Sequence, residues 1–173
     1  MKRLPFEELA TTKKGNLGER ICIEHFHSKG LVVMTSITDS AHAFDIMVWQ
    51  GKEKPCIVDI KTKASRTHYP DTGFDTADLD HYLKISEKHN MPVAIFFVDE
   101  HRKEVYWGEL GDLLQEREVT EGNRTLKYPR SEWNITYFPL EAMNKLCDLD
   151  DVQVKELKNH TNRNYSYPTL KSA

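Results

Sequence analysis

The chain has 173 residues, of which 39% are hydrophobic and 29% are charged, and its net charge is −3. These values suit one globular domain with its own core and exclude a largely disordered chain. No apolar run approaches the ~20 residues that a membrane-spanning helix needs, and the first residues lack the apolar core of a signal peptide. We therefore expect a cytoplasmic protein with no membrane partner.

The cysteine spacing and the charge distribution argue against several classes of protein. Cys22, Cys56 and Cys147 are far apart, and no CxxC pair occurs, which argues against a disulfide framework and against a structural zinc site. Residues 1–70 have a net charge of +3, so the remainder has −6. The acidic total argues against a protein that coats nucleic acid without specificity.

Hydrophobic periodicity predicts an α/β domain in which the first elements follow the order helix, three strands, helix, strand, strand. The expected elements are a helix over 15–30, strands over 31–36, 43–49 and 55–61, a loop over 64–74, a helix over 76–90 with Thr76 as N-cap, a buried strand over 92–98 and an edge strand over 104–107.

Beyond residue 110 the pattern is weaker. It predicts a short helix over 110–118, a strand over 133–138 and helices over 140–149 and 151–158. We expect residues 1–110 to form the core, 111–158 to form an extension packed on the same domain, and 159–173 to be a polar tail.

The third expected strand carries a carboxylate and an ammonium group on one face. Asp59 and Lys61 are two residues apart, so they project to the same side, whereas Ile60 projects into the apolar packing. One interpretation is an ion pair at the rim of the sheet. The other is metal-assisted phosphodiester hydrolysis, which needs carboxylates for Mg²⁺ and a cation near the attacking water.

Two further acids strengthen the second interpretation. Asp45 interrupts an apolar strand, where a carboxylate is unfavourable unless it is paired or bound to metal. Hairpin pairing would bring it close to Asp59, and two such carboxylates favour a cation between them. Glu19 shares a helical row with Cys22 and Phe26. It lies either at the exposed end of that row or near the metal.

These residues resemble those of the PD-(D/E)xK superfamily of restriction-endonuclease-like nucleases. The resemblance rests on three segments: Lys14-Gly15-Asn16-Leu17-Gly18-Glu19, Phe44-Asp45 and Val58-Asp59-Ile60-Lys61. It covers about residues 13–108. The arrangement looks most like that of small Holliday-junction-resolvase-type nucleases. Phe44 stands where the nominal signature has Pro, and Asp59 stands where Glu is commoner.

The resemblance implies a restriction-endonuclease-like core, with a mixed central sheet flanked by helices in αβββαβ order, and metal-dependent cleavage of DNA. Asp45 and Asp59 would bind Mg²⁺ or Mn²⁺, Glu19 would be an auxiliary ligand, and Lys61 would position the attacking water. Relatives often act as homodimers, for which the edge at 107–109 or the C-terminal helices could supply the interface.

Substrate contacts are expected from cations and aromatic side chains near the motif. The candidates for DNA binding are Lys13, Lys14, Lys63, Arg66, His68 and Tyr69. For the last four the alternative is an ordinary solvated loop. Tyr82 or His81 could assist catalysis, or they could be a core residue and a surface residue, respectively.

Two other functions stay open at this point. The same fold could serve as a non-catalytic nucleic-acid-binding or assembly module. Alternatively, the chain could be an unrelated α/β domain in which the acid-x-Lys triplet arose by chance, since Glu156-Leu157-Lys158 matches it too.

Overall fold

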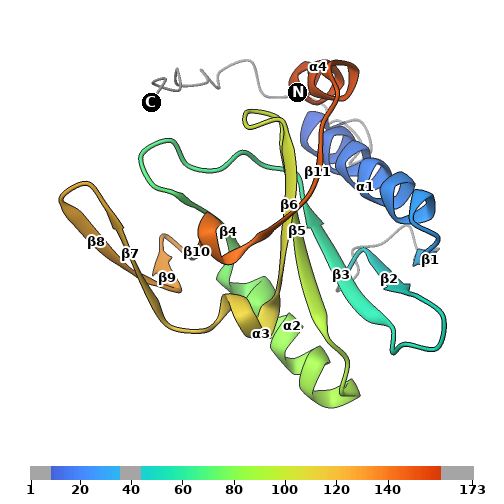
Figure 1. The fold of residues 1–173 in the computed structure, drawn as a ribbon, viewed down its shortest axis with the longest axis horizontal. Helices are drawn as coiled ribbons and strands as arrows, with labels where there is room; N and C mark the ends of the chain where they lie inside the picture. Colours follow the sequence, from blue (N-terminus) through green and yellow to red (C-terminus); the bar gives the residue numbers. More distant parts are fainter. Residues whose placement is uncertain (1–8, 36–43, 161–173) are drawn as a thin grey trace, which may run out of the picture.

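The computed structural model describes residues 9–35 and 44–160, and its centre is a six-stranded mixed sheet (Figure 1). The strand order is β1-β2-β3-β5-β6-β11, in which only the β3–β5 pair is parallel. The bounds of these strands are β1 (Val32–Thr35), β2 (Ile46–Trp49), β3 (Cys56–Lys61), β5 (Val93–Asp99), β6 (Glu104–Glu109) and β11 (Asn144–Asp148). This mixed sheet, flanked by helices, confirms the predicted α/β fold class.

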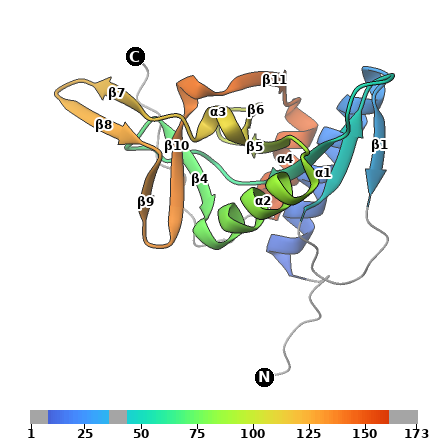
Figure 2. The same ribbon diagram turned by 90° about the horizontal axis from the view of Figure 1, so that it is seen from below.

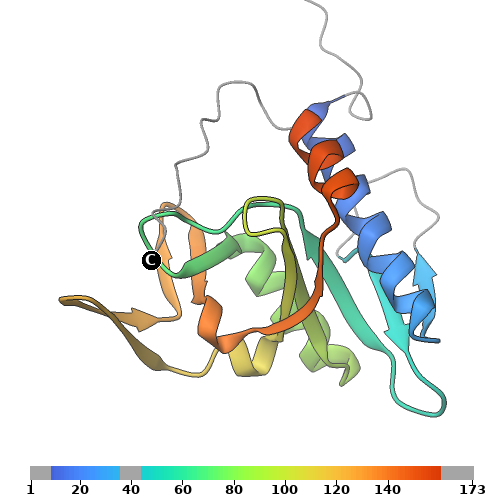
Figure 3. The same cartoon turned by 45° about the horizontal axis from the view of Figure 1, so that its top comes forward.

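Helices cover both faces of the sheet because the alternating side chains of its strands are apolar on both sides. On one face, α1 (Ala10–Ser28) and α4 (Asp151–Asn159) lie side by side (Figure 3) and pack on Val58 and Ile60 of β3. On the other face, α2 (Thr76–His89) and α3 (Leu110–Leu113) pack on Ile57. The prediction that Ile60 points away from Asp59 into apolar packing is therefore confirmed.

A second, smaller sheet lies beside α2, and a hairpin extends beyond it (Figure 2). The small sheet has the order β4-β10-β9, with β10 antiparallel to both of its neighbours. Its strands are β4 (Asp71–Asp75), β9 (Arg130–Glu132) and β10 (Ile135–Pro139), the hairpin is β7 (Arg117–Glu121) with β8 (Arg124–Tyr128), and a 3-10 turn, η2 (Leu140–Ala142), follows β10.

Several predicted elements differ from those in the structure, because contacts with distant parts of the chain decide their conformation. The segment 140–149 was predicted as a helix, but half of it is β11, because pairing with β6 satisfies its backbone. That pairing covers β6 from Glu104 to Trp107, so β6 is not the edge strand that the sequence predicted there. In the predicted helix 110–118 only α3 is helical, and β7 begins at Arg117. The predicted loop 64–74 contains most of β4, which pairs with β10.

The ends of two helices also differ from the prediction. The first helix begins at Ala10 rather than at residue 15, and Asp75 rather than Thr76 is the N-cap of α2. Asn90, in the left-handed conformation, ends α2 as a C-cap. No helix in the described ranges is long and apolar enough to cross a membrane. The tail over 161–173 lies outside the described residues.

Candidate active site

The candidate site begins where β2 and β3 part. Ile46 is the last residue of β2 to pair with β3, opposite Val58. Just before it, the N–H of Asp45 donates to the Val58 carbonyl at 3.2 Å, and Asp45 Oδ2 accepts from the N–H of Ile60 at 2.6 Å. Asp45 thus lies at the entry to β2 rather than inside the strand, and its carboxylate satisfies the backbone donor that the parting strands would leave unpaired.

Asp59 and Lys61 lie on the α2 face of β3, as their spacing predicted. Lys61 Nζ is 3.0 Å from Asp59 Oδ2 and donates to Asp78 Oδ2 on α2 at 2.9 Å. Burial lowers the pKa of Lys61, but the charge of Asp59 and the hydrogen bonds to Asp78 and Asp59 outweigh that effect, so its pKa is raised. Lys61 is therefore a fixed cation at neutral pH.

The aromatic rings of Phe74 and Tyr82 form the inner wall beside this cation. Lys61 Nζ lies 5.9 Å from the centre of the Phe74 ring and 5.7 Å from that of Tyr82. Burial, the charge of Asp59 and a hydrogen bond to Asp59 raise the pKa of Tyr82 well above its usual range. Tyr82 is therefore a neutral, buried side chain against Asp59, and His81 is exposed.

Two carboxylates share this corner of the sheet. The pKa of Asp45 is raised to about 7, chiefly by burial, then by the charge of Asp59, and further by Glu19, while the Ile60 hydrogen bond lowers it. Asp59 is only 5% exposed, and its Oδ2 lies 3.0 Å from Lys61 Nζ. A buried carboxylate beside a second, half-buried carboxylate is a setting that a further cation stabilises.

Glu19 approaches from α1. Its charge raises the pKa of Asp45 and of Cys22, so it lies within electrostatic reach of both. Helix α1 comes close to the end of β3 because residue 18 is glycine: a Cβ there would lie 1.9 Å from Thr62 Oγ1. Nevertheless, no three Asp, Glu, His or Cys side chains within residues 9–35 and 44–160 form a compact metal-binding group.

Asp45 and Asp59, which interact through their charges, form a two-carboxylate donor set, which suits a metal that needs few protein ligands. Mg²⁺ commonly keeps several waters and takes one or two carboxylates together with substrate phosphates. Asp45 and Asp59 would supply those two carboxylates, whereas Glu19 is not joined to both of them in one cluster.

A hollow of about 260 Å³ opens beside Lys61 between the start of α1, the end of β3 and the start of α2. Lys63 and Thr62 lie on its β3 side, and Asp75 and Asp78 lie on its α2 side. Burial lowers the pKa of Lys63, and the nearby charge of Lys61 lowers it further against the opposing effect of Asp75. The hollow thus brings the side chains of Lys61 and Lys63 to one opening, and Asp59 reaches it through its ion pair with Lys61.

The other cations predicted to bind DNA divide into exposed and paired ones. Lys13 is exposed on α1 and lines a groove of about 520 Å³ between α1 and α4. Lys14 instead forms an ion pair with buried Glu100. Both lie inside α1, which begins at Ala10.

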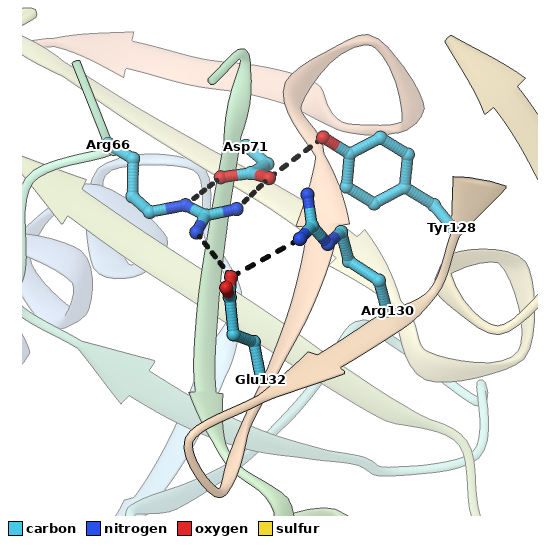
Figure 4. A network of polar contacts seen from close by, with 5 residues as sticks. All are labelled: Arg66, Asp71, Tyr128, Arg130 and Glu132. Carbon is cyan, nitrogen blue, oxygen red and sulfur yellow. Dashed lines mark hydrogen bonds and ion pairs between the residues drawn. The ribbon is translucent and has the colours of Figure 1, made fainter. Parts of the chain in front are cut away.

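Arg66 belongs to a polar network that joins the loop after β3 to the small sheet (Figure 4). Its Nε and Nη2 donate to the two oxygens of fully buried Asp71 at 2.6 and 2.5 Å, and Nη1 donates to Glu132 at 3.2 Å. Tyr128 also donates to Asp71, and Arg130 to Glu132. Arg66 is therefore held by two carboxylates of the protein itself.

The aromatic candidate of this loop is engaged as well. The guanidinium of Arg66 lies 4.3 Å from the centre of the Tyr69 ring and 3.7 Å from that of Tyr137, a cation–π arrangement. Tyr69 therefore already stacks within the protein, while His68 is exposed. Of the four loop residues predicted to contact substrate, Lys63 lies on the hollow itself.

Sequence reasoning missed Asp78. It lies one helical turn before Tyr82, which the sequence did single out, and it holds Lys61. A signal existed, because an acid in the first turn of a helix that follows the motif is available to a lysine. The docking of α2 on β3 that brings them together is not visible in the sequence.

Comparisons with known proteins place solved nucleases beside this chain. A Holliday junction resolvase, Hjc from Archaeoglobus fulgidus, is similar to 75% of this chain over 86% of its own length, with 10% identity and a TM-score of 0.49. D212, a nuclease from a fusselovirus, is similar to 92% of this chain over 97% of its own length, with 9% identity and a TM-score of 0.46. No family model and no curated protein sequence matches the chain.

Proposed function

We propose that this protein is a divalent-metal-dependent endonuclease that hydrolyses DNA phosphodiester bonds. The observation that carries the proposal is the convergence of Asp45, Asp59 and Lys61 at the point where β2 and β3 part. A half-buried cation fixed beside two carboxylates, next to an open hollow, suits metal-assisted phosphodiester hydrolysis.

Each side chain has a role that follows from its surroundings. Asp45 and Asp59 would hold Mg²⁺ or Mn²⁺, because their proximity and burial raise the pKa of Asp45 in the absence of a cation. Bound there, the metal would polarise the phosphate and lower the pKa of a water. Glu19 adds a third negative charge near the pair, as an auxiliary residue.

Lys61 would orient the attacking water and stabilise charge on the phosphate. Asp78 fixes its ammonium group from the α2 side, and the rings of Phe74 and Tyr82 close the inner wall behind it. A pre-positioned cation needs no reorganisation when negative charge develops, which is the main source of electrostatic catalysis.

Of the cations that the sequence predicted to bind DNA, we propose that Lys63 and Lys13 contact the DNA backbone. Lys63 lines the hollow, whereas Lys13 is exposed and lines the separate groove between α1 and α4. Such contacts position DNA without reading its sequence and weaken with salt. His68, which is exposed, is also a candidate for contact with DNA.

The experiment uses supercoiled plasmid together with linear, branched and single-stranded DNAs, in Mg²⁺, Mn²⁺ or EDTA. The proposal expects cutting of at least one of these DNAs with metal and none in EDTA. Binding of DNA without metal-dependent cutting of any substrate would instead support a non-catalytic binding module. Light scattering of the purified chain tests the predicted homodimer.

A further inference from the structure

The turn between β9 and β10 carries a tryptophan that packing does not explain. Trp133 is 90% exposed, the highest exposure among the large hydrophobic side chains described. Leaving an indole in water forfeits the burial that such a side chain would otherwise gain. Nothing in the fold of the described residues therefore requires a ring at this position.

Turn geometry does not explain it either. Glu132 pairs with Ile135, so Trp133 and Asn134 form a two-residue loop, and both have positive φ values, 54° and 62°. Positive φ at both central residues is the pattern of a type I′ turn, which strongly favours Asn, Asp and Gly. A tryptophan in the left-handed region is strained. Trp133 is therefore both strained in its backbone and exposed in its side chain, and the fold explains neither.

The turn is fixed in place beside the candidate active site. The N–H of Thr76, the first residue of α2, donates to the Asn134 carbonyl at 2.8 Å, and the Thr76 hydroxyl lies 2.9 Å from that of Thr136. Ile135 pairs with Asp75, which lines the hollow next to Lys61. In Figure 2 the β9–β10 turn points to the same side of the molecule as the β4–α2 junction and the beginning of α1.

We propose that Trp133 is a stacking platform for an unpaired nucleobase of the DNA whose backbone lies in the hollow beside Lys61 and Lys63. Aromatic rings stack on bases of any sequence, and an unpaired base is free to offer its face to such a ring. A rigid hairpin tip presents the ring without the entropy cost of ordering a loop. The inference rests on the proposed function and names its substrate class: DNA with single-stranded character near the cleaved bond.

The test compares a labelled duplex that carries a single-stranded extension with the same duplex fully paired, both in EDTA so that no cleavage occurs. Fluorescence anisotropy measures the affinity of the full-length wild type, Trp133→Gly, Trp133→Leu and Trp133→Phe. Glycine suits the positive φ, so its turn should fold at least as well. Val152→Ala, an exposed apolar residue on α4, is the matched control.

The expected result is a loss of about 5- to 100-fold in affinity for the extended DNA in both Trp133→Gly and Trp133→Leu. Trp133→Phe and Val152→Ala should keep most of the affinity, and binding of the fully paired duplex should change little. Cleavage of the extended DNA with Mg²⁺ should fall in the same order.

The failures are distinguishable. If wild type binds and cuts DNA but Trp133→Gly binds the extended DNA equally well, the base-stacking inference is overturned and the nuclease proposal stands. If Trp133→Gly changes the oligomeric state instead, with DNA affinity intact, the tryptophan serves contacts between copies and the inference is likewise overturned. If wild type neither binds nor cuts any DNA, both proposals fail.

Discussion

The Asp45 carboxylate accepts a hydrogen bond from the backbone N–H of Ile60 at 2.6 Å, across the point where their two strands separate. One side chain therefore serves the fold and the candidate metal site together. The hydrogen bond fixes the carboxylate next to Asp59, and the same proximity raises its pKa. Asp45 thus has two roles, as a hydrogen-bond acceptor that stabilises the fold and as a candidate metal ligand. Substitutions that keep one role and remove the other can test them separately.

The isosteric substitution should separate these roles. Asp45→Asn keeps an oxygen that accepts from Ile60 and removes a charge that opposes Asp59, so we expect equal or greater stability at neutral pH and no metal-dependent cleavage. Asp45→Ala leaves the Ile60 donor without this partner, at a cost of about 1–3 kcal/mol. Urea unfolding of both variants measures the difference, and equal stability of the two would contradict this account of the hydrogen bond.

Stability should depend on pH in a direction set by Asp45. Its pKa is about 7 in the folded protein against 3.8 for the ordinary carboxyl, so between these values the folded state binds the additional proton. In EDTA, this group should therefore make the free energy of unfolding fall as pH rises from about 4 to about 7, by up to about 1.4 kcal/mol per pH unit. Unfolding titrations should show a shallower fall for Asp45→Asn; an identical slope would refute the assignment.

Asp78 is expected to support catalysis through Lys61. Asp78→Asn removes a charge-assisted hydrogen bond worth about 1.5–3 kcal/mol, so a loss of about 10- to 100-fold in cleavage rate is expected if that bond fixes the ammonium for the transition state. DNA affinity should change little. Asp75→Asn is the matched control, because it removes the same charge from the same hollow without touching the Lys61–Asp78 pair. Similar losses in both variants would indicate a general charge effect.

Arg66 should matter for stability rather than for DNA affinity. Arg66→Met leaves the fully buried Asp71 without its bidentate partner, which costs about 3–5 kcal/mol in comparable buried pairs. The double variant Arg66→Met/Asp71→Asn should recover part of that loss. Lys103→Ala, which breaks the exposed pair with Asp151, should cost about 1 kcal/mol or less. A large drop in DNA affinity with stability intact would restore Arg66 to the substrate contacts.

The parts of the site that lie on adjacent strands could be predicted from the sequence, because strand alternation and hairpin pairing are local rules. Asp59, Lys61 and the opposite direction of Ile60 follow from a period of two. Asp78 could not be predicted in the same way, because its contact depends on how α2 docks against β3. The ion pair of Arg66 with Glu132 could not be predicted either, because these two residues are 66 positions apart.

The region after residue 110 shows where local patterns fail. The segment 140–149 has a helical pattern, yet β6 offers a free ladder that the segment completes as β11. Trp133 was placed at the start of a strand, but it lies in a tight turn with positive φ, a conformation that its residue type does not signal. In both cases tertiary contacts outweigh intrinsic preference.

The most direct test of the central claim is the rate of DNA cleavage in Mg²⁺ by wild type, Asp59→Asn, Lys61→Met and the control Asp75→Asn, each shown to be folded by its unfolding transition. We predict cutting by wild type and Asp75→Asn, abolished by EDTA, and loss of cutting in Asp59→Asn and Lys61→Met with DNA binding retained. Undiminished cutting by folded Asp59→Asn or Lys61→Met would contradict the assignment of the active site to the parting of β2 and β3.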